Sequence, residues 1–184
     1  MSDVDVLESV LAKDAKLLAA VRPEQLSAPT PCPDYDVEAL VNHIIGWLRV
    51  FAASASGRIV DDDPAGFVST DPVADFESAA AELIAGWRAG GVDRTVRLIG
   101  ADLPAQMVLA MTLMEYVTHG CDLAKAIDQT VPFSDDELAI TLERAHATLP
   151  DQYRGEGKTF GNVIEVAHEA PVLDRLMGFM GRRP

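Results

Sequence analysis

One segment restricts the fold of this chain more than any other, the apolar run from Met107 to Met114 (MVLAMTLM). Thr112 is its one polar residue, so a helix through this run has apolar side chains on nearly every side. Such a helix is stable in water only when neighbouring elements cover most of its surface. The run therefore predicts a buried helix, from about Pro104 to Ile127, in a protein built from packed helices.

Apolar residues at helical spacing predict four more helices. Their apolar stripes lie over residues 3–21, 37–51, 73–89 and 135–149. Asp36 and Ser134 are expected to cap the starts of the second and the last of these, and Gly90-Gly91 to end the third. The connections suit a four- or five-helix bundle, and 184 residues fit one domain.

Two parts of the chain are expected to be less regular. Residues 95–99 (TVRLI) alternate between polar and apolar, which fits a short strand or an extended arm. Residues 163–166 (VIEV) predict an extended piece, and residues 173–180 a short helix. The expected fold class is all-α, with one domain over residues 1–184 and an irregular C-terminal extension that contains a short extended segment and a helix.

The net charge of the chain argues against some classes of binding partner. The formal net charge is −14 and the only basic cluster is Arg182-Arg183, so we expect neither nucleic acid nor an anionic membrane as a partner. No apolar stretch reaches the roughly 18 residues that a membrane span needs, and the start, MSDVDVLESV, lacks the pattern of a secretory signal. Two cysteines give no disulfide framework, so we expect a cytoplasmic protein.

A polar stripe on the buried helix is the main candidate for a functional site. Thr112, Glu115, His119 and Asp122 are spaced by three, four and three residues, so they share one side of that helix. A carboxylate that is buried without a partner costs several kcal/mol, so an inward-facing stripe needs a counter-ion or a metal. The plain alternative is a Glu–His pair one helical turn apart, which stabilises a helix by a few tenths of a kcal/mol.

His43 adds a third candidate metal ligand. It lies at the edge of the apolar stripe of the second helix, where it is either a satisfied rim residue or a group that faces Glu115 and His119 across two adjacent helices. Two imidazoles and one carboxylate form the usual three-ligand set of a catalytic divalent metal. Asp122 is then either a surface residue or the acceptor for the outer ring nitrogen of a ligand histidine.

A second arrangement has to be weighed against this one. Glu143 with His146, and Glu165 with His168, have the E-x-x-H spacing of di-iron carboxylate bundles. The second pair falls in the segment that we expect to be extended, where residues three apart point to opposite faces, so we disfavour a di-iron site. Cys32 and Cys121 have no neighbouring motif that would activate a thiol, and we interpret both as structural.

Three motifs resemble one family of proteins. Residues 30–43 (TPCPDYDVEALVNH) resemble the T-P-C-x-x-W-x-V-x-x-L-x-x-H opening of the mycothiol-dependent maleylpyruvate isomerase N-terminal family, which belongs to the DinB-like, metal-binding four-helix bundles. Residues 115–124 (EYVTHGCDLA) resemble its E-x-x-x-H-x-W-D-L-A signature. Residues 160–184 resemble the F-G…A-P-x-x-D-R-L…G-R-x-P ending of a short subfamily. The motifs depart from the pattern at Tyr35 and Cys121, which stand where tryptophan is usual, and we expect these changes to alter packing.

The resemblance implies a DinB-like four-helix bundle with a divalent metal, most often zinc, bound by His43, Glu115 and His119. The same ligands also accept nickel, manganese or iron. By family analogy the second cofactor is mycothiol, a low-molecular-weight thiol that the metal would activate for transfer to an electrophile or for an isomerisation. We expect this protein to lack the additional C-terminal domain of the true isomerase, so maleylpyruvate itself is not the expected substrate. The alternative is a non-catalytic, metal-stabilised or metal-sensing bundle in which Asp122 or His146 closes the coordination. We expect a monomer or a homodimer.

Overall fold

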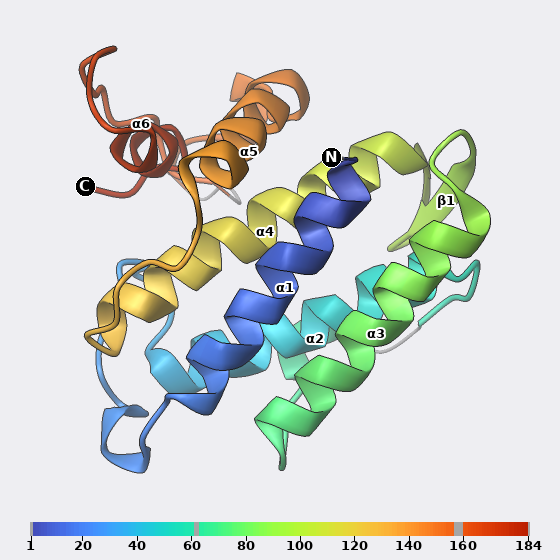
Figure 1. Cartoon of the computed structure of the whole chain (residues 1–184), viewed down its shortest axis with the longest axis horizontal. Helices are drawn as coiled ribbons and strands as arrows, with labels where there is room; N and C mark the ends of the chain where they lie inside the picture. Colours follow the sequence, from blue (N-terminus) through green and yellow to red (C-terminus); the bar gives the residue numbers. More distant parts are fainter. Residues whose placement is uncertain (1, 61–62, 157–159, 184) are drawn as a thin grey trace.

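Four long helices make up the largest part of the structure, a computed structural model that describes residues 2–60, 63–156 and 160–183. The helices are α1 (Asp3–Ala19), α2 (Val37–Ala55), α3 (Pro72–Gly90) and α4 (Ala105–Ala126). Helix α1 contacts α3 and α4, and α2 contacts the same two helices, so each of the four packs against two others (Figure 1). This arrangement gives α4 neighbours on several sides.

Helix α4 is buried over most of its length, as its apolar sequence predicts. Sixteen of its 22 residues are buried, among them every residue from Tyr116 to Ala124. Because this stretch includes His119 and Asp122, polar groups lie inside the protein at a point where the helix has no solvent-facing side. The prediction of a buried central helix is confirmed.

The predicted caps define where helices begin. The Asp36 side chain accepts a hydrogen bond from the Ala39 amide at 2.9 Å, and Ser134 forms a reciprocal capping box at the start of α5 (Asp135–Thr148). Helix α3 ends before Gly91, whose φ of +66° suits a glycine. Helix α2 runs to Ala55, four residues past the predicted end at Phe51, because its last residues are small and pack closely against Gly86 of α3.

The structure corrects the expectation of an all-α protein. Strands β1 (Thr95–Leu98) and β2 (Ala101–Pro104) form an antiparallel pair, joined by Ile99 and Gly100 with positive φ values of 43° and 77°. Positive φ at both central residues is typical of the tight turn that matches strand twist. Residues 95–98 of this segment thus form a strand and not a free arm, Ile99 belongs to the turn, and the fold is mostly helical with a small two-stranded sheet.

The C-terminal part packs on the far side of α4. Helix α5 contacts α4, and α6 (Val172–Phe179) contacts α5 (Figure 1). Residues 161–167 have no regular secondary structure, but the amide of Ile164 donates to Gly178 of α6 at 2.9 Å. Three short 3₁₀ helices complete the described part, η1 (Pro23–Gln25), η2 (Pro64–Gly66) and η3 (Asp151–Tyr153).

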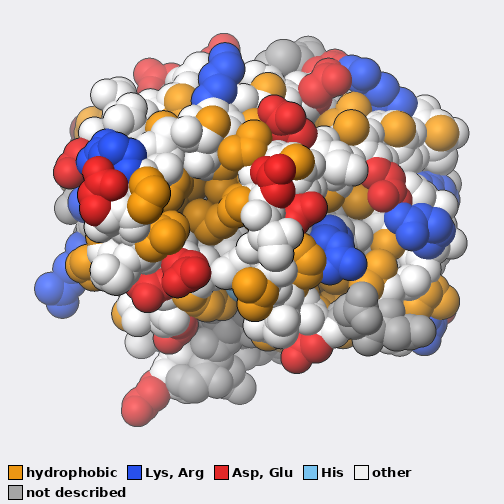
Figure 2. All heavy atoms as spheres, turned by 90° about the horizontal axis from the view of Figure 1, so that it is seen from below, with side chains coloured by type: hydrophobic (Ala, Val, Ile, Leu, Met, Phe, Trp, Pro, Cys, Tyr) orange, Lys and Arg blue, Asp and Glu red, His pale blue; other side chains and the backbone are white. Residues whose placement is uncertain are grey.

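The surface reflects the acidic composition. On the face in Figure 2, Asp and Glu side chains are scattered among Lys and Arg and surround a hollow lined by apolar groups, without forming a single acidic patch. None of the helices in the described residues is long and apolar enough to cross a membrane.

Candidate metal centre

His43, Glu115 and His119 come together between α2 and α4. The His43 Nε2 atom lies 2.8 Å from Glu115 Oε1, and His119 Nε2 lies 3.5 Å from the same oxygen. One ligand atom from each of the three residues lies within 4.8 Å of the other two. The two imidazoles and the carboxylate that the sequence analysis singled out therefore share one site, although they come from segments 72 residues apart.

Local contacts explain why the two helices meet in this register. Glu115 and His119 are one turn apart on α4, so both side chains face the same neighbour. The next residue, Tyr116, donates a hydrogen bond from its hydroxyl to the carbonyl of Ile44 at 2.9 Å. Ile44 follows His43 directly on α2, so this buried contact fixes the two helices beside the three candidate ligands.

The electrostatics favour an ionised Glu115. Burial raises the pKa of its carboxyl, but the charge of His119 and the hydrogen bond from His43 lower it by more, so the pKa lies below its usual range. The Glu115 side chain is 20% exposed and that of His43 is 16% exposed. The centre is thus largely buried, but it has contact with solvent on the side of these two residues.

Each candidate ligand histidine has a partner for its outer ring nitrogen. His119 Nδ1 lies 3.1 Å from Asp122 Oδ2, and His43 Nδ1 lies 2.9 Å from the Tyr35 hydroxyl. A carboxylate only accepts hydrogen bonds, so Asp122 favours the proton of His119 on Nδ1 and leaves Nε2 free as a donor atom for a metal. A hydroxyl both donates and accepts, so Tyr35 is compatible with either tautomer of His43.

Tyr35 is a site residue that the sequence analysis did not identify. We expected the change from tryptophan to alter packing, but the side chain also contacts a candidate ligand through its hydroxyl. Burial raises the pKa of this hydroxyl, so it stays neutral. The loop is held in place by Thr30, whose hydroxyl donates to the carbonyl of Tyr35 at 2.8 Å. Tyr35 lies just before the helix that carries His43, and this position could have indicated a contact between the two side chains.

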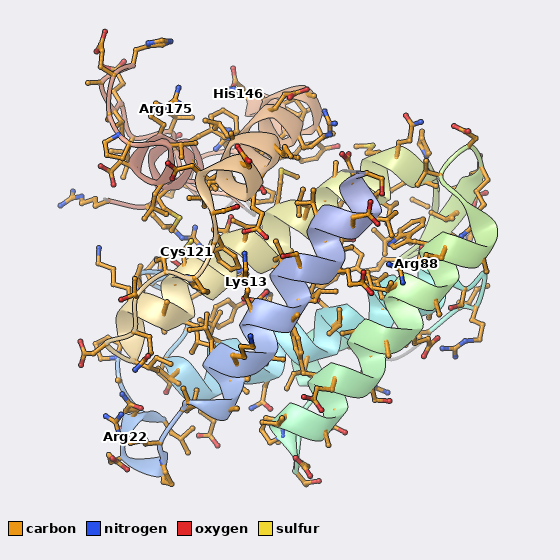
Figure 3. The ribbon with its side chains drawn as sticks, in the orientation of Figure 1. Lys13, Arg22, Arg88, Cys121, His146 and Arg175 are labelled. Carbon is orange, nitrogen blue, oxygen red and sulfur yellow. The ribbon has the colours of Figure 1, made fainter. Side chains whose placement is uncertain are left out.

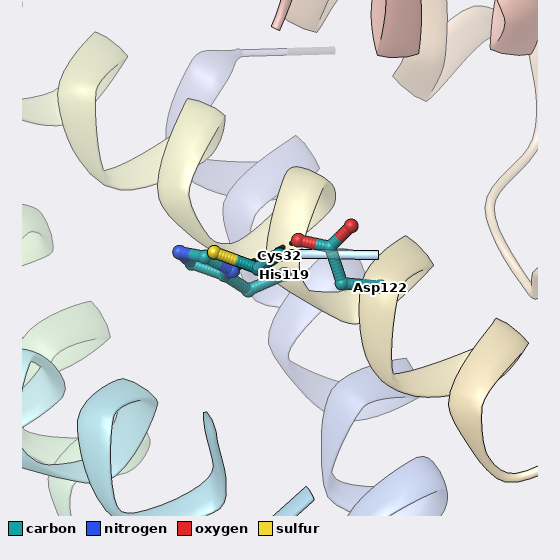
Figure 4. Close-up of side chains that lie close together, drawn as sticks. All are labelled: Cys32, His119 and Asp122. Atoms are coloured by element: carbon teal, nitrogen blue, oxygen red, sulfur yellow. Dashed lines mark hydrogen bonds and ion pairs between the residues drawn. The ribbon is translucent and has the colours of Figure 1, made fainter. Parts of the chain in front are cut away.

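Cys32 also lies near the candidate metal centre, next to His119 and Asp122. Its sulfur, a ring nitrogen of His119 and an oxygen of Asp122 lie within 4.8 Å of one another (Figure 4). Cys32 is 6% exposed, and burial raises the pKa of its thiol, so it is not an activated nucleophile.

Asp122 has a further partner that the sequence analysis did not identify. Arg182 Nη2 lies 3.0 Å from the Oδ2 atom of Asp122.

The rival di-iron arrangement is not assembled. Glu143, His146, Glu165 and His168 belong to neither group of potential metal ligands in the described residues. His146 lies on α5 (Figure 3), where its ring packs against Phe179 at a centroid distance of 4.1 Å. Cys121 is buried on α4, and burial raises the pKa of its thiol far above the usual value, in agreement with a structural role.

Comparisons with known proteins can be set beside this geometry. The family described as the mycothiol maleylpyruvate isomerase N-terminal domain matches residues 7–124. Two uncharacterized proteins of Mycobacterium tuberculosis, from the strains CDC 1551 / Oshkosh and ATCC 25618 / H37Rv, are each 34% identical to the chain over 170 residues, which is 91% of the chain and 91% of each relative. No solved structure matches the chain. The three candidate ligands and Asp122 lie inside the matched range, whereas Arg182 lies outside it.

Proposed function

This chain belongs to the mycothiol maleylpyruvate isomerase N-terminal domain family, and we propose that it is a zinc-dependent enzyme that uses a low-molecular-weight thiol. In this proposal His43, Glu115 and His119 bind the metal, and the thiol is mycothiol. The reaction is an S-transfer to an electrophile or an isomerisation in which the thiol adds and leaves. The observation that carries the proposal is the meeting of His43 Nε2, Glu115 Oε1 and His119 Nε2 at one point between α2 and α4.

The proposal includes the architecture. We infer that α1, α2, α3 and α4 form the DinB-like four-helix bundle of the family, in one domain that includes the C-terminal extension. The pairwise contacts of α1 and α2 with both α3 and α4 support this inference. A bundle core is a common location for metal ligands, because side chains from facing helices converge there.

The chemistry of the donor set fits a divalent metal such as zinc. It contains two imidazole nitrogens and one carboxylate oxygen, the set found in several catalytic zinc sites. The outer nitrogens of both histidines are occupied by Tyr35 and Asp122, which is the support that metal-binding histidines normally have. Among the described residues this group has three members, so a four-coordinate metal would keep one position for a substrate atom.

A bound divalent metal would supply a Lewis acid that lowers the pKa of a coordinating thiol and stabilises the thiolate near neutral pH. Glu115 contributes one negative charge and the two neutral imidazoles contribute none, so the donor set leaves one positive charge for a thiolate to neutralise. The partial exposure of His43 and Glu115 gives a thiol access from solvent. Asp122 and Tyr35 orient the two rings while the thiol binds.

Metal analysis is the first test. Purified wild-type protein is expected to contain about one zinc per chain by mass spectrometry of the metal, or nickel, manganese or iron if supply favours them. His43→Ala is expected to lose the metal, because it removes the ligand that α2 contributes. His168→Ala is the matched control, since His168 is exposed and belongs to neither ligand group. A metal-free wild type, or equal metal in both variants, refutes the site.

Thiol chemistry is the second test. Zinc-loaded protein is mixed with mycothiol and model electrophiles, and the consumption of thiol is followed against the protein-free reaction and the His43→Ala protein. A rate above both supports the enzyme. A metal that is bound without any rate, and that has four protein ligands in its X-ray absorption spectrum, supports the non-catalytic alternative instead.

A further inference from the structure

We propose that Arg182 is a positioning residue of the metal centre, which acts through Asp122 on the orientation and tautomer of His119. The inference rests on the proposed function, because it assigns His119 as a metal ligand. Arg182 belongs to the C-terminal segment, outside the residues that match the family, so the inference also makes this segment part of the centre.

The contacts form an unbroken chain from Arg182 to the candidate ligand. Arg182 Nη2 donates to Asp122 Oδ2 at 3.0 Å, and Arg182 Nε lies 3.3 Å from the same oxygen. That oxygen is also the atom 3.1 Å from His119 Nδ1. One carboxylate oxygen thus joins the guanidinium to the imidazole.

Burial makes this contact important. The Asp122 side chain is fully buried, and that of Arg182 is only 11% exposed. A buried carboxylate is unstable without a counter-ion, and a planar guanidinium that donates from two nitrogens also fixes the plane of the carboxylate. Without Arg182, Asp122 would lose both its counter-charge and the contacts that aim Oδ2 at His119.

The backbone delivers Arg182 to this position. After α6 the chain turns at Gly181, whose φ of +78° is in the left-handed region that favours glycine. The amide of Arg182 donates to the carbonyl of Met177 at 2.8 Å, and its Nη1 donates to the carbonyl of Met180 at 3.1 Å. The guanidinium thus lies between the end of α6, where it contacts Met180, and α4, where it contacts Asp122.

The contact between Arg182 and Asp122 also argues against a second metal site at Cys32, His119 and Asp122. These three side chains are close enough to bind a cation, but Asp122 is already bound by the guanidinium of Arg182. The positive charge beside Asp122 is thus supplied by the protein. We infer one metal per chain, bound on the Nε2 side of His119, with Arg182 on the Nδ1 side.

The test compares zinc affinity in wild type and four variants by competition with a chelator. Arg182→Met keeps an unbranched, flexible side chain and removes the guanidinium with its charge, and it is expected to weaken zinc binding 10- to 100-fold, the usual effect of losing support for a ligand histidine. Asp122→Asn is expected to cause a similar loss. The double variant is expected to be no weaker than Asp122→Asn alone, because Arg182 acts through Asp122. The matched control, Arg183→Met, changes the neighbouring exposed arginine and should bind zinc like wild type.

Two readouts separate positioning from a general loss of structure. The cobalt-substituted protein reports ligand geometry through its visible spectrum, which should change in Arg182→Met and be restored in part by Arg182→Lys. The ring ¹⁵N shifts of His119 in the metal-free protein report the tautomer, which should be Nδ1–H in wild type and shift in Arg182→Met. If Arg182→Met alone is unfolded, Arg182→Lys, which keeps the charge and loses the planar guanidinium, allows the same measurements.

The outcomes distinguish this inference from the proposed function. Wild type that binds no zinc refutes the proposed function, but the tautomer of His119 still tests the effect of Arg182. Zinc binding in wild type that is unchanged by Arg182→Met refutes the inference and leaves the function standing. Equal further losses from Arg182→Met in the wild-type and Asp122→Asn backgrounds also refute it, because Arg182 would then act independently of Asp122.

Discussion

Asp14 provides a test of the packing around α4 that does not depend on the metal centre. This residue of α1 is 2% exposed, and neither of its carboxylate oxygens has a hydrogen-bond partner in the part of the chain that the structure describes. Burial raises the pKa of its carboxyl well above the usual value, the charge of Glu137 raises it further, and the charge of Lys13 lowers it. The folded protein therefore holds Asp14 in the protonated form over a range of pH in which the unfolded chain is ionised.

The sign of the pH dependence follows from this difference. A carboxyl with a raised pKa in the folded state favours folding most at low pH, below the unfolded value of about 3.8. As the pH rises towards the folded pKa, the unfolded chain releases a proton that the folded chain keeps, so stability is lost. One such group changes the free energy of unfolding by at most about 1.4 kcal/mol per pH unit.

The perturbation is Asp14→Asn, which keeps the shape of the side chain and removes its ionisation. We expect the wild type to lose stability relative to Asp14→Asn as the pH rises above the unfolded value of about 3.8, by at most about 1.4 kcal/mol per pH unit, measured by urea unfolding with circular dichroism. Glu137 has the opposite pH dependence, because hydrogen bonds from Lys13 and Ser9 outweigh its burial and lower its pKa. Using the difference between the two proteins cancels the titration of all other groups.

Asp93→Asn is the control, since Asp93 is an exposed carboxylate in a turn. Its stability should follow that of wild type in parallel from pH 4 to pH 8. The reasoning is refuted if the difference between wild type and Asp14→Asn is constant over this range. It is also refuted if the variant is the less stable protein at pH 7.

Three further predictions follow from the contacts described above. Tyr35→Phe should weaken zinc binding 10- to 100-fold in a chelator competition, because it removes the hydroxyl beside His43 Nδ1 and keeps the ring; unchanged affinity would contradict this role. Gly120→Ala should destabilise the protein by about 1–3 kcal/mol in urea unfolding, because a Cβ would overlap Asp14 Oδ1, whereas Gly66→Ala meets no atom within 4 Å and should be neutral; equal effects would refute the close approach. Zinc at 100 times its dissociation constant should stabilise wild type by about 2.7 kcal/mol in thermal unfolding, and chelation should reverse the gain; the same shift in His43→Ala would mean that zinc binds elsewhere.

The helices were predictable from the sequence because their signals are local. Apolar spacing and the caps Asp36 and Ser134 placed most helix ends within two residues of their observed positions. The end of α2 was missed, because small residues at 52–55 continue the helix only through their packing against α3. Strand β2 was missed because it is four residues long and mostly exposed, and because Pro104 was interpreted as the start of a helix.

The candidate site also contains residues that were predictable from local spacing and residues whose positions depend on tertiary packing. Glu115 and His119 are one turn apart, so their spacing alone indicated a pair. That His43 faces them depends on the register between α2 and α4, which spacing does not define, so the residues alone left a rim position open as the alternative. Tyr35 and Arg182 approach from a loop and from the C-terminal segment, whose positions arise only from tertiary packing. Whether the three residues bind a metal stays a prediction.

The separation of the donors along the chain has a consequence for how the protein acquires its metal. Glu115 and His119 are neighbours on one helix, whereas His43 is 72 residues from Glu115. Bringing such distant points together in a flexible chain costs about 4 kcal/mol of closure entropy, which docking of α2 on α4 has already compensated in the native state. In an unfolded or newly made chain only Glu115 and His119 are close enough to bind the same ion. Tight metal binding is therefore expected only after the tertiary structure has formed. Metal binding would then indicate that the protein has folded.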